Sequence, residues 1–69
     1  MGTRQVVQGD RHGGWEVRGG ASHVTRREAE EEARQRLRER EGTGELVVLD
    51  LYHRVTLVER VSGRVPAAR

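Results

Sequence analysis

The sequence predicts a single α+β domain: a four-stranded antiparallel sheet in the order β-β-α-β-β, with one helix packed on one face. Three observations predict this fold. The chain has 69 residues, close to the lower limit for one hydrophobic core, so we expect one domain over 1–69. Short runs that alternate apolar and charged residues flank the middle of the chain. That middle consists of strong helix formers with a clear start signal.

The first two expected strands lie on either side of a glycine-rich turn. The first strand covers 3–8 and contains two valines, and the glycines and aspartate of 9–14 are typical turn residues. In the second strand Trp15 and Val17 alternate with charged residues, so both should face the core. Two further glycines end this strand.

The helix has the clearest local signal in the sequence. Thr25 and Glu28 have the spacing of a capping box, so the helix should begin at Arg26. It should continue to Glu41, because Gly42 follows and can adopt the left-handed conformation that ends helices. Ala29, Ala33 and Leu37 form an apolar stripe along this helix. Together with Trp15, Val17 and Val48, they make up the expected core.

The last two expected strands form an antiparallel hairpin through 50–54. The first of them is apolar on both faces, and the second alternates. A single helix covers only one face of a sheet, so Val47, Leu49 and Val58 on the other face predict an exposed apolar patch or a dimer surface. We expect order over about 3–62 and a flexible tail over 63–69.

The composition predicts a thin core and therefore a homodimer. Apolar residues make up 33% of the chain and aromatic residues 3%, and cysteine is absent. Small domains without disulfides or metals commonly gain stability by association. No run approaches the roughly 20 apolar residues that span a bilayer, and the first ten residues do not resemble a secretory signal. We expect a cytoplasmic protein with no membrane contact.

No catalytic or metal site is recognisable in the sequence. The spacing of His12, His23 and His53 fits no metal pattern, and exposed loop histidines are far commoner than a site built from them. The glycines lie between expected strands rather than at the start of a helix that could hold a phosphate. We therefore expect no enzyme activity, no cofactor and no metal.

Two classes of binding function stay open. All 13 basic residues are arginines, which suits phosphate recognition but also follows from a GC-rich genome. We favour slightly a homodimer that binds DNA or RNA, although the acidic run 28–32 would repel phosphate. The alternative is a protein-interaction or dimerisation module that binds no nucleic acid. The arginines expected to contact phosphates are Arg18, Arg26, Arg27 and Arg54.

Several of these segments together resemble a family of small bacterial proteins, domain of unknown function 2188. The matching pieces are Val6-Val7, Gly14-Trp15-Glu16-Val17-Arg18, Ala21-Ser22, Thr25-Arg26-Arg27-Glu28-Ala29, Ala33-Arg34 and Gly44-Glu45-Leu46-Val47-Val48. The resemblance covers about 5–60 and implies a compact β-β-α-β-β fold with no established activity. Members usually carry a glycine in the final hairpin turn, where this chain has Leu51-Tyr52-His53-Arg54, so the hairpin register stays open.

Overall fold

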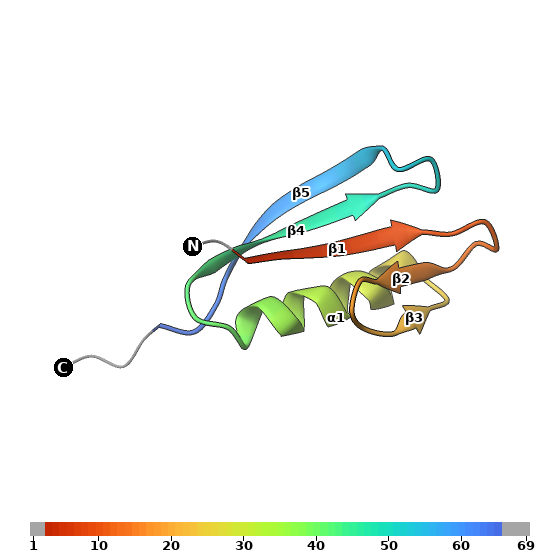
Figure 1. The fold of residues 1–69 in the computed structure, drawn as a ribbon. Helices are drawn as coiled ribbons and strands as arrows, with labels where there is room; N and C mark the ends of the chain where they lie inside the picture. Colours follow the sequence, from red (N-terminus) through yellow and green to blue (C-terminus); the bar gives the residue numbers. More distant parts are fainter. Residues whose placement is uncertain (1–2, 66–69) are drawn as a thin grey trace.

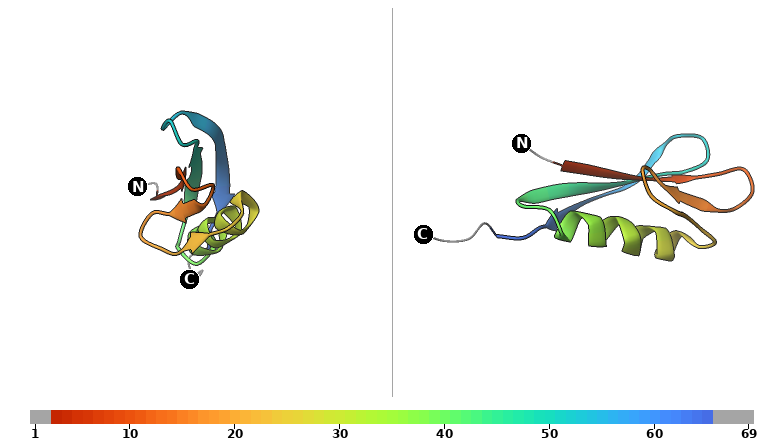
Figure 2. Two further views of the ribbon diagram at one scale, coloured as in Figure 1. Left: turned by 90° about the vertical axis from the view of Figure 1, so that its right-hand side faces the viewer. Right: turned by 60° about the horizontal axis from the view of Figure 1, so that its bottom comes forward.

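The computed structural model describes residues 3–65 as one sheet with a helix lying along one of its faces (Figure 1). The helix lies beneath the sheet when the molecule is seen from the side (Figure 2). The elements, in chain order, are β1 (Thr3–Gly9), β2 (Trp15–Val17), β3 (Ser22–His23), α1 (Arg26–Arg38), β4 (Thr43–Leu49) and β5 (Val55–Ser62).

The prediction of four antiparallel strands is wrong. The sheet has five strands in the order β3-β2-β1-β4-β5, and β1 pairs with β4 in parallel, from Thr3 with Gly44 to Gln8 with Leu49. The parallel pair arises because α1 returns the chain to the end of the molecule where β1 begins. The next strand must then run in the same direction as β1, as the arrows in Figure 1 show. The strand that the prediction lacked is β3, which has only two residues, too few to show an alternating pattern.

The core lies between α1 and the sheet. Ala29, Ala33 and Leu37 are buried on the helix, as the sequence predicts, and the two alanines let the helix approach the strands closely. Trp15 is only partly buried and packs against the edge of this core. The buried sheet residues that contact the helix layer are Val7, Val17, Leu46, Val48 and Val61, of which the sequence predicted Val17 and Val48.

The ends of α1 show why the helix starts where predicted and stops earlier. The Thr25 hydroxyl accepts from the amide of Glu28 at 3.2 Å, so the predicted start at Arg26 is confirmed. The helix ends at Arg38 rather than Glu41. Residues 40–42 instead form hydrogen bonds with the segment that follows β5: the Gly63 amide donates to the Gly42 carbonyl at 2.8 Å. Of the expected tail over 63–69, residues 66–69 lie outside the described residues.

Two side-chain contacts attach α1 to β5 and β3, the strands at the two edges of the sheet. Arg34 Nε and Nη2 each donate to a Glu59 carboxylate oxygen on β5 at 2.9 Å, a bidentate pair. His23 Nε2 on β3 lies 2.6 Å from Glu32 Oε1. The hydrogen bond from Arg34 lowers the pKa of Glu59, and the hydrogen bond with His23 lowers the pKa of Glu32.

These lowered pKa values predict acid sensitivity. A carboxylate whose pKa is lower in the folded state stabilises the fold above its ordinary pKa, here 4.5, and loses that contribution as pH falls through the folded value. We therefore expect the melting temperature, followed by circular dichroism at fixed protein concentration, to fall as the pH drops below about 4.5. Glu59→Gln should melt lower at neutral pH and flatten this dependence. An unchanged pH profile in Glu59→Gln would contradict a contribution from the Arg34 pair.

Candidate functional site

The face of the sheet opposite α1 presents side chains in rows that cross three strands. Side chains alternate along a strand, so the neighbours of the core residues point away from the helix. The register of β1, β4 and β5 aligns these residues in three consecutive rows. The rows are Arg4, Glu45 and Arg60; then Val6, Val47 and Val58; then Gln8, Leu49 and Val55.

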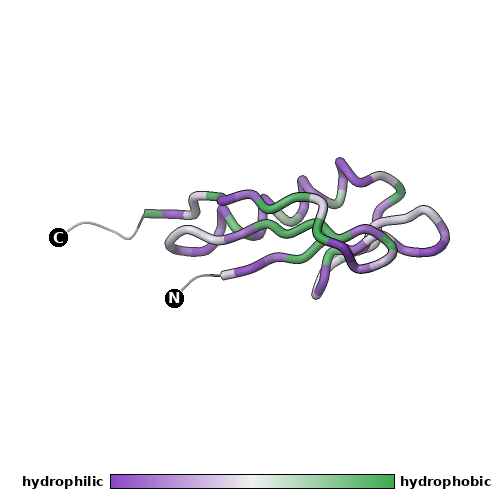
Figure 3. Tube along the Cα trace, turned by 90° about the horizontal axis from the view of Figure 1, so that it is seen from above, coloured by the Kyte–Doolittle hydropathy of each residue, from purple (hydrophilic) through white to green (hydrophobic). Residues whose placement is uncertain are grey.

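Five apolar residues of these rows form one continuous patch, here called the open-face patch: Val6, Val47, Leu49, Val55 and Val58. Val55 and Val58, on the edge strand β5, are 59% and 55% exposed. Val47 and Leu49 are half-buried, and Val6 on the central strand is buried. Figure 3, in which the molecule is seen from above, shows apolar segments in the middle of the strands and mostly hydrophilic loops. The predicted placement of Val47, Leu49 and Val58 on the uncovered face is confirmed by the register.

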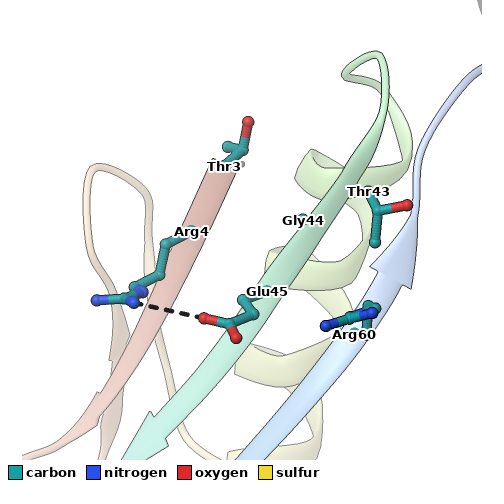
Figure 4. A pocket seen from close by; sticks show the side chains of 6 residues that line it. All are labelled: Thr3, Arg4, Thr43, Gly44, Glu45 and Arg60. Atoms are coloured by element: carbon teal, nitrogen blue, oxygen red, sulfur yellow. Dashed lines mark hydrogen bonds and ion pairs between the residues drawn. The ribbon is translucent and has the colours of Figure 1, made fainter. Parts of the chain in front are cut away.

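Charged side chains of both signs surround the open-face patch. At one end, Arg4 Nη2 lies 3.4 Å from Glu45 Oε1, and Arg60 extends from β5 toward the same glutamate (Figure 4). Together with Thr3, Thr43 and Gly44 these residues line a depression of about 420 Å³. Glu16 pairs with Gln8 across β1 and β2. An apolar centre with a mixed charged rim is typical of protein–protein interfaces.

Of the four arginines expected at a nucleic-acid surface, the fold separates Arg18 from the other three. Arg18 follows β2, and its amide donates to the Val6 carbonyl at 2.9 Å, which places it beside the open-face patch. Arg26, Arg27 and Arg54 lie at the opposite end of β2, where α1 begins and β4 ends (Figure 1).

Two of these arginines are engaged within the protein. Arg26 lies over the Trp15 ring, 5.8 Å from its centroid, and pairs with Glu30. Arg54 pairs with Asp50 at 3.3 Å. Arg18 and Arg27 form no ion pair with the described part of the chain. Arg18 therefore lies apart from the other three arginines, and phosphate binding by any of the four stays a prediction.

Metal-binding and membrane-spanning features are absent from the described residues. Within residues 3–65, no three His, Cys, Asp or Glu side chains are placed so that they could hold a metal ion. In the same range, no helix has the length and apolar character needed to cross a membrane. His23 is engaged with Glu32, and the other two histidines lie in separate turns.

Sequence reasoning missed two features of the surface. It did not place Val6 in the patch, because two adjacent valines give no indication of which faces the helix. It also counted Tyr52 with Trp15 as an aromatic residue of the core, whereas Tyr52 is 68% exposed in the turn between β4 and β5. Asp10 and Asp50 each stand at the first position of a five-residue turn, 10–14 and 50–54. This shared spacing could have indicated that the two turns are similar.

Comparison with known proteins identifies the family. Residues 4–55 match the model of a family described as uncharacterised proteins conserved in bacteria (DUF2188). No curated protein and no solved structure matches the chain. The matched range contains β1 except Thr3, β2 to β4 and the whole of α1, which is most of the described fold. The chain is therefore a member of the DUF2188 family of bacterial proteins.

Proposed function

We propose that this protein is a non-enzymatic binding protein that works as a homodimer, in which the open faces of two sheets pack against each other. The open-face patch is the observation that supports the proposal. Val55 and Val58 are more than half exposed beside the partly buried Val47 and Leu49. Burying the exposed half of a valine side chain contributes about 1 kcal/mol, and every contact occurs twice in a symmetric dimer.

The charges around the patch favour a second copy of this chain as the partner. An interface between identical copies must complement itself. Arg4, Glu45 and Arg60 alternate in sign along their row. A two-fold axis parallel to the strands, between β1 and β4, brings Arg4 of one protomer opposite Glu45 of its partner. The same axis brings Val6 opposite Val47, as in two packed sheets.

Nucleic acid fits the open face less well. Phosphates would meet Glu16 and Glu45 as well as arginines, and like charges repel. DNA or RNA therefore stays a proposal for a different surface. The proposal also includes a cytoplasmic location, which fractionation of the native bacterium would test.

The dimer is tested by light scattering coupled to size-exclusion chromatography over a range of protein concentrations. We expect the parent protein to have the mass of two chains. Val58→Glu should give a folded monomer, because each copy would place a carboxylate in an apolar interface. Val24→Glu is the matched control, because Val24 is 82% exposed and lies between β3 and α1. The Val24→Glu variant should have the same mass in solution as the parent protein.

A charge exchange tests the geometry of the dimer. Glu45→Arg alone should shift the equilibrium toward monomer, because Arg4 of the partner would then face a cation. The double variant Arg4→Glu with Glu45→Arg should restore the dimer. A parent protein that remains monomeric at the highest concentration, or a Val58→Glu protein that still dimerises, would contradict the proposed interface.

A further inference from the structure

The two hairpin turns at one end of the sheet, residues 10–14 and 50–54, have the same backbone architecture. In each, an aspartate Oδ1 accepts from the amides two and four residues later, at 2.8 and 3.0 Å for Asp10 and at 2.8 and 2.9 Å for Asp50. In each, the aspartate amide also donates to the carbonyl four residues later. Its carbonyl accepts from the amide three residues later. The two turns therefore present their middle residues in the same way.

The turns lie side by side because they follow neighbouring parallel strands, β1 and β4 (Figure 1). The Gln8 side chain joins them: its Nε2 donates to the Asp50 carbonyl at 2.7 Å and to the Gly9 carbonyl at 3.0 Å. A Cβ placed on Gly9 would lie 3.3 Å from the Leu51 amide nitrogen, so the two chain segments are in close contact. The paired turns are a preorganised surface.

His53, in the second turn, has a backbone conformation that favours glycine. Gly13 of the first turn has φ of 83°, and the equivalent position in the second turn is His53, with φ of 65°. A side chain is disfavoured there, and glycine would relieve the strain. The second turn thus presents an imidazole at a cost to stability.

The exposed side chains of the paired turns are aromatic, apolar or basic. Tyr52 is 68% and Leu51 46% exposed, and the Arg54 guanidinium lies 5.2 Å from the centroid of the Tyr52 ring. In the first turn Arg11 and His12 are exposed. Both aspartates accept from the amides of their own turns, so their carboxylates face the backbone.

The surface extends from the first turn toward the start of α1. A depression of about 320 Å³ lies between that turn and the segment leading into the helix, with His12 on one side and Ser22 and His23 on the other. Arg27 is exposed in the first turn of α1, two residues after its cap. The two chain segments that border the depression therefore each carry or lead to an exposed arginine, Arg11 in the first turn and Arg27 at the start of α1.

We propose that this end of the molecule binds single-stranded nucleic acid, with an unpaired base stacked on the exposed face of Tyr52 and phosphates held by Arg11, Arg54 and Arg27. Stacking on an exposed aromatic ring suits a strand whose bases are unpaired, because the bases of a duplex already stack on each other. This surface is distinct from the open-face patch. The inference therefore goes beyond the proposed dimer.

Fluorescence polarisation with labelled oligothymidine, oligouridine and a duplex of equal length tests the inference. At low ionic strength we expect both single strands to bind more tightly than the duplex, with an affinity that falls as salt is added. Tyr52→Ala should weaken binding by about tenfold, and Tyr52→Phe should retain it because the stacking ring remains. A preference between the two single strands would identify RNA or DNA as the ligand.

A charge-matched control separates a site from general attraction to arginine. Arg11→Ala should weaken binding, whereas Arg40→Ala, two residues beyond the far end of α1, should not. His53→Gly should melt at a higher temperature, because glycine relieves the strain of a positive φ. The monomeric Val58→Glu variant should still bind, so failure of the dimer and failure of this site are distinguishable. Equal losses from Arg11→Ala and Arg40→Ala, tighter duplex binding, or no binding at low ionic strength would overturn the inference.

Discussion

Leu37→Ala should remove most of the stability of this domain. Leu37 is 1% exposed and is among the largest fully buried side chains in the described part of the protein. A Cβ placed on Gly44 of β4 would lie 2.6 Å from Leu37 Cδ2, so the leucine packs directly on the sheet backbone. Truncating a buried leucine costs about 2–5 kcal/mol, while small domains have only about 5–15 kcal/mol in total.

Urea unfolding followed by circular dichroism, at one protein concentration, measures this effect. The matched control is Leu51→Ala, the same change at a leucine that is 46% exposed in a turn. We expect the control to change the unfolding free energy by no more than about 0.5 kcal/mol. Equal losses in the two variants would show that Leu37 is not the centre of the core.

Gly63→Ala should destabilise the protein almost as strongly, for a steric reason. A Cβ at Gly63 would collide with the Arg40 carbonyl oxygen and lie 2.5 Å from that of Gly42 and 2.8 Å from that of Leu37. All three are backbone atoms, so no side chain can rotate away. The segment after α1 must move, which weakens the bonds from the amides of Gly63 and Arg64. We expect a loss of about 3 kcal/mol from this overpacking.

Gly42→Ala separates this steric effect from ordinary backbone strain. Gly42 has φ of 84°, and a Cβ there would meet nothing within 4 Å. Its substitution should cost about 1 kcal/mol, the usual penalty for a side chain in the left-handed region. Thermal melting of both variants gives the comparison. Similar melting temperatures would contradict the close approach of Gly63 to the end of α1.

Local features of the fold could be predicted from the sequence, and the strand arrangement could not. Thr25 and the stripe of Ala29, Ala33 and Leu37 predicted the start and the buried face of α1, because capping and helical periodicity depend on residues within a few positions. The pairing of β1 with β4 depends on the direction in which the helix returns the chain. The sequence near Val6 and Val47 carries no signal for that direction.

The same distinction between local patterns and long-range contacts applies to the candidate surfaces. The alternation of Val47, Leu49 and Val58 predicted an apolar face opposite the helix, since alternation is local. The arginines could not be located by sequence position, because Arg26 and Arg54 are engaged by neighbours that come close only in the fold or the turn. The similarity of the two turns was present in the spacing of Asp10 and Asp50, but their adjacency required the parallel strand pair.

The central position of β1 has a consequence for the order of events during synthesis. Among the strands of this sheet β1 is synthesised first, yet its β4 neighbour is made only after the whole of α1, and Thr3 pairs with Gly44. Until then the hairpin of β1 and β2 lacks the neighbour that covers its other edge, and isolated two-stranded hairpins are marginal in water. The middle of the sheet therefore assembles late, from residues distant in the chain, which slows folding. A nascent chain stalled before β4 should remain sensitive to protease.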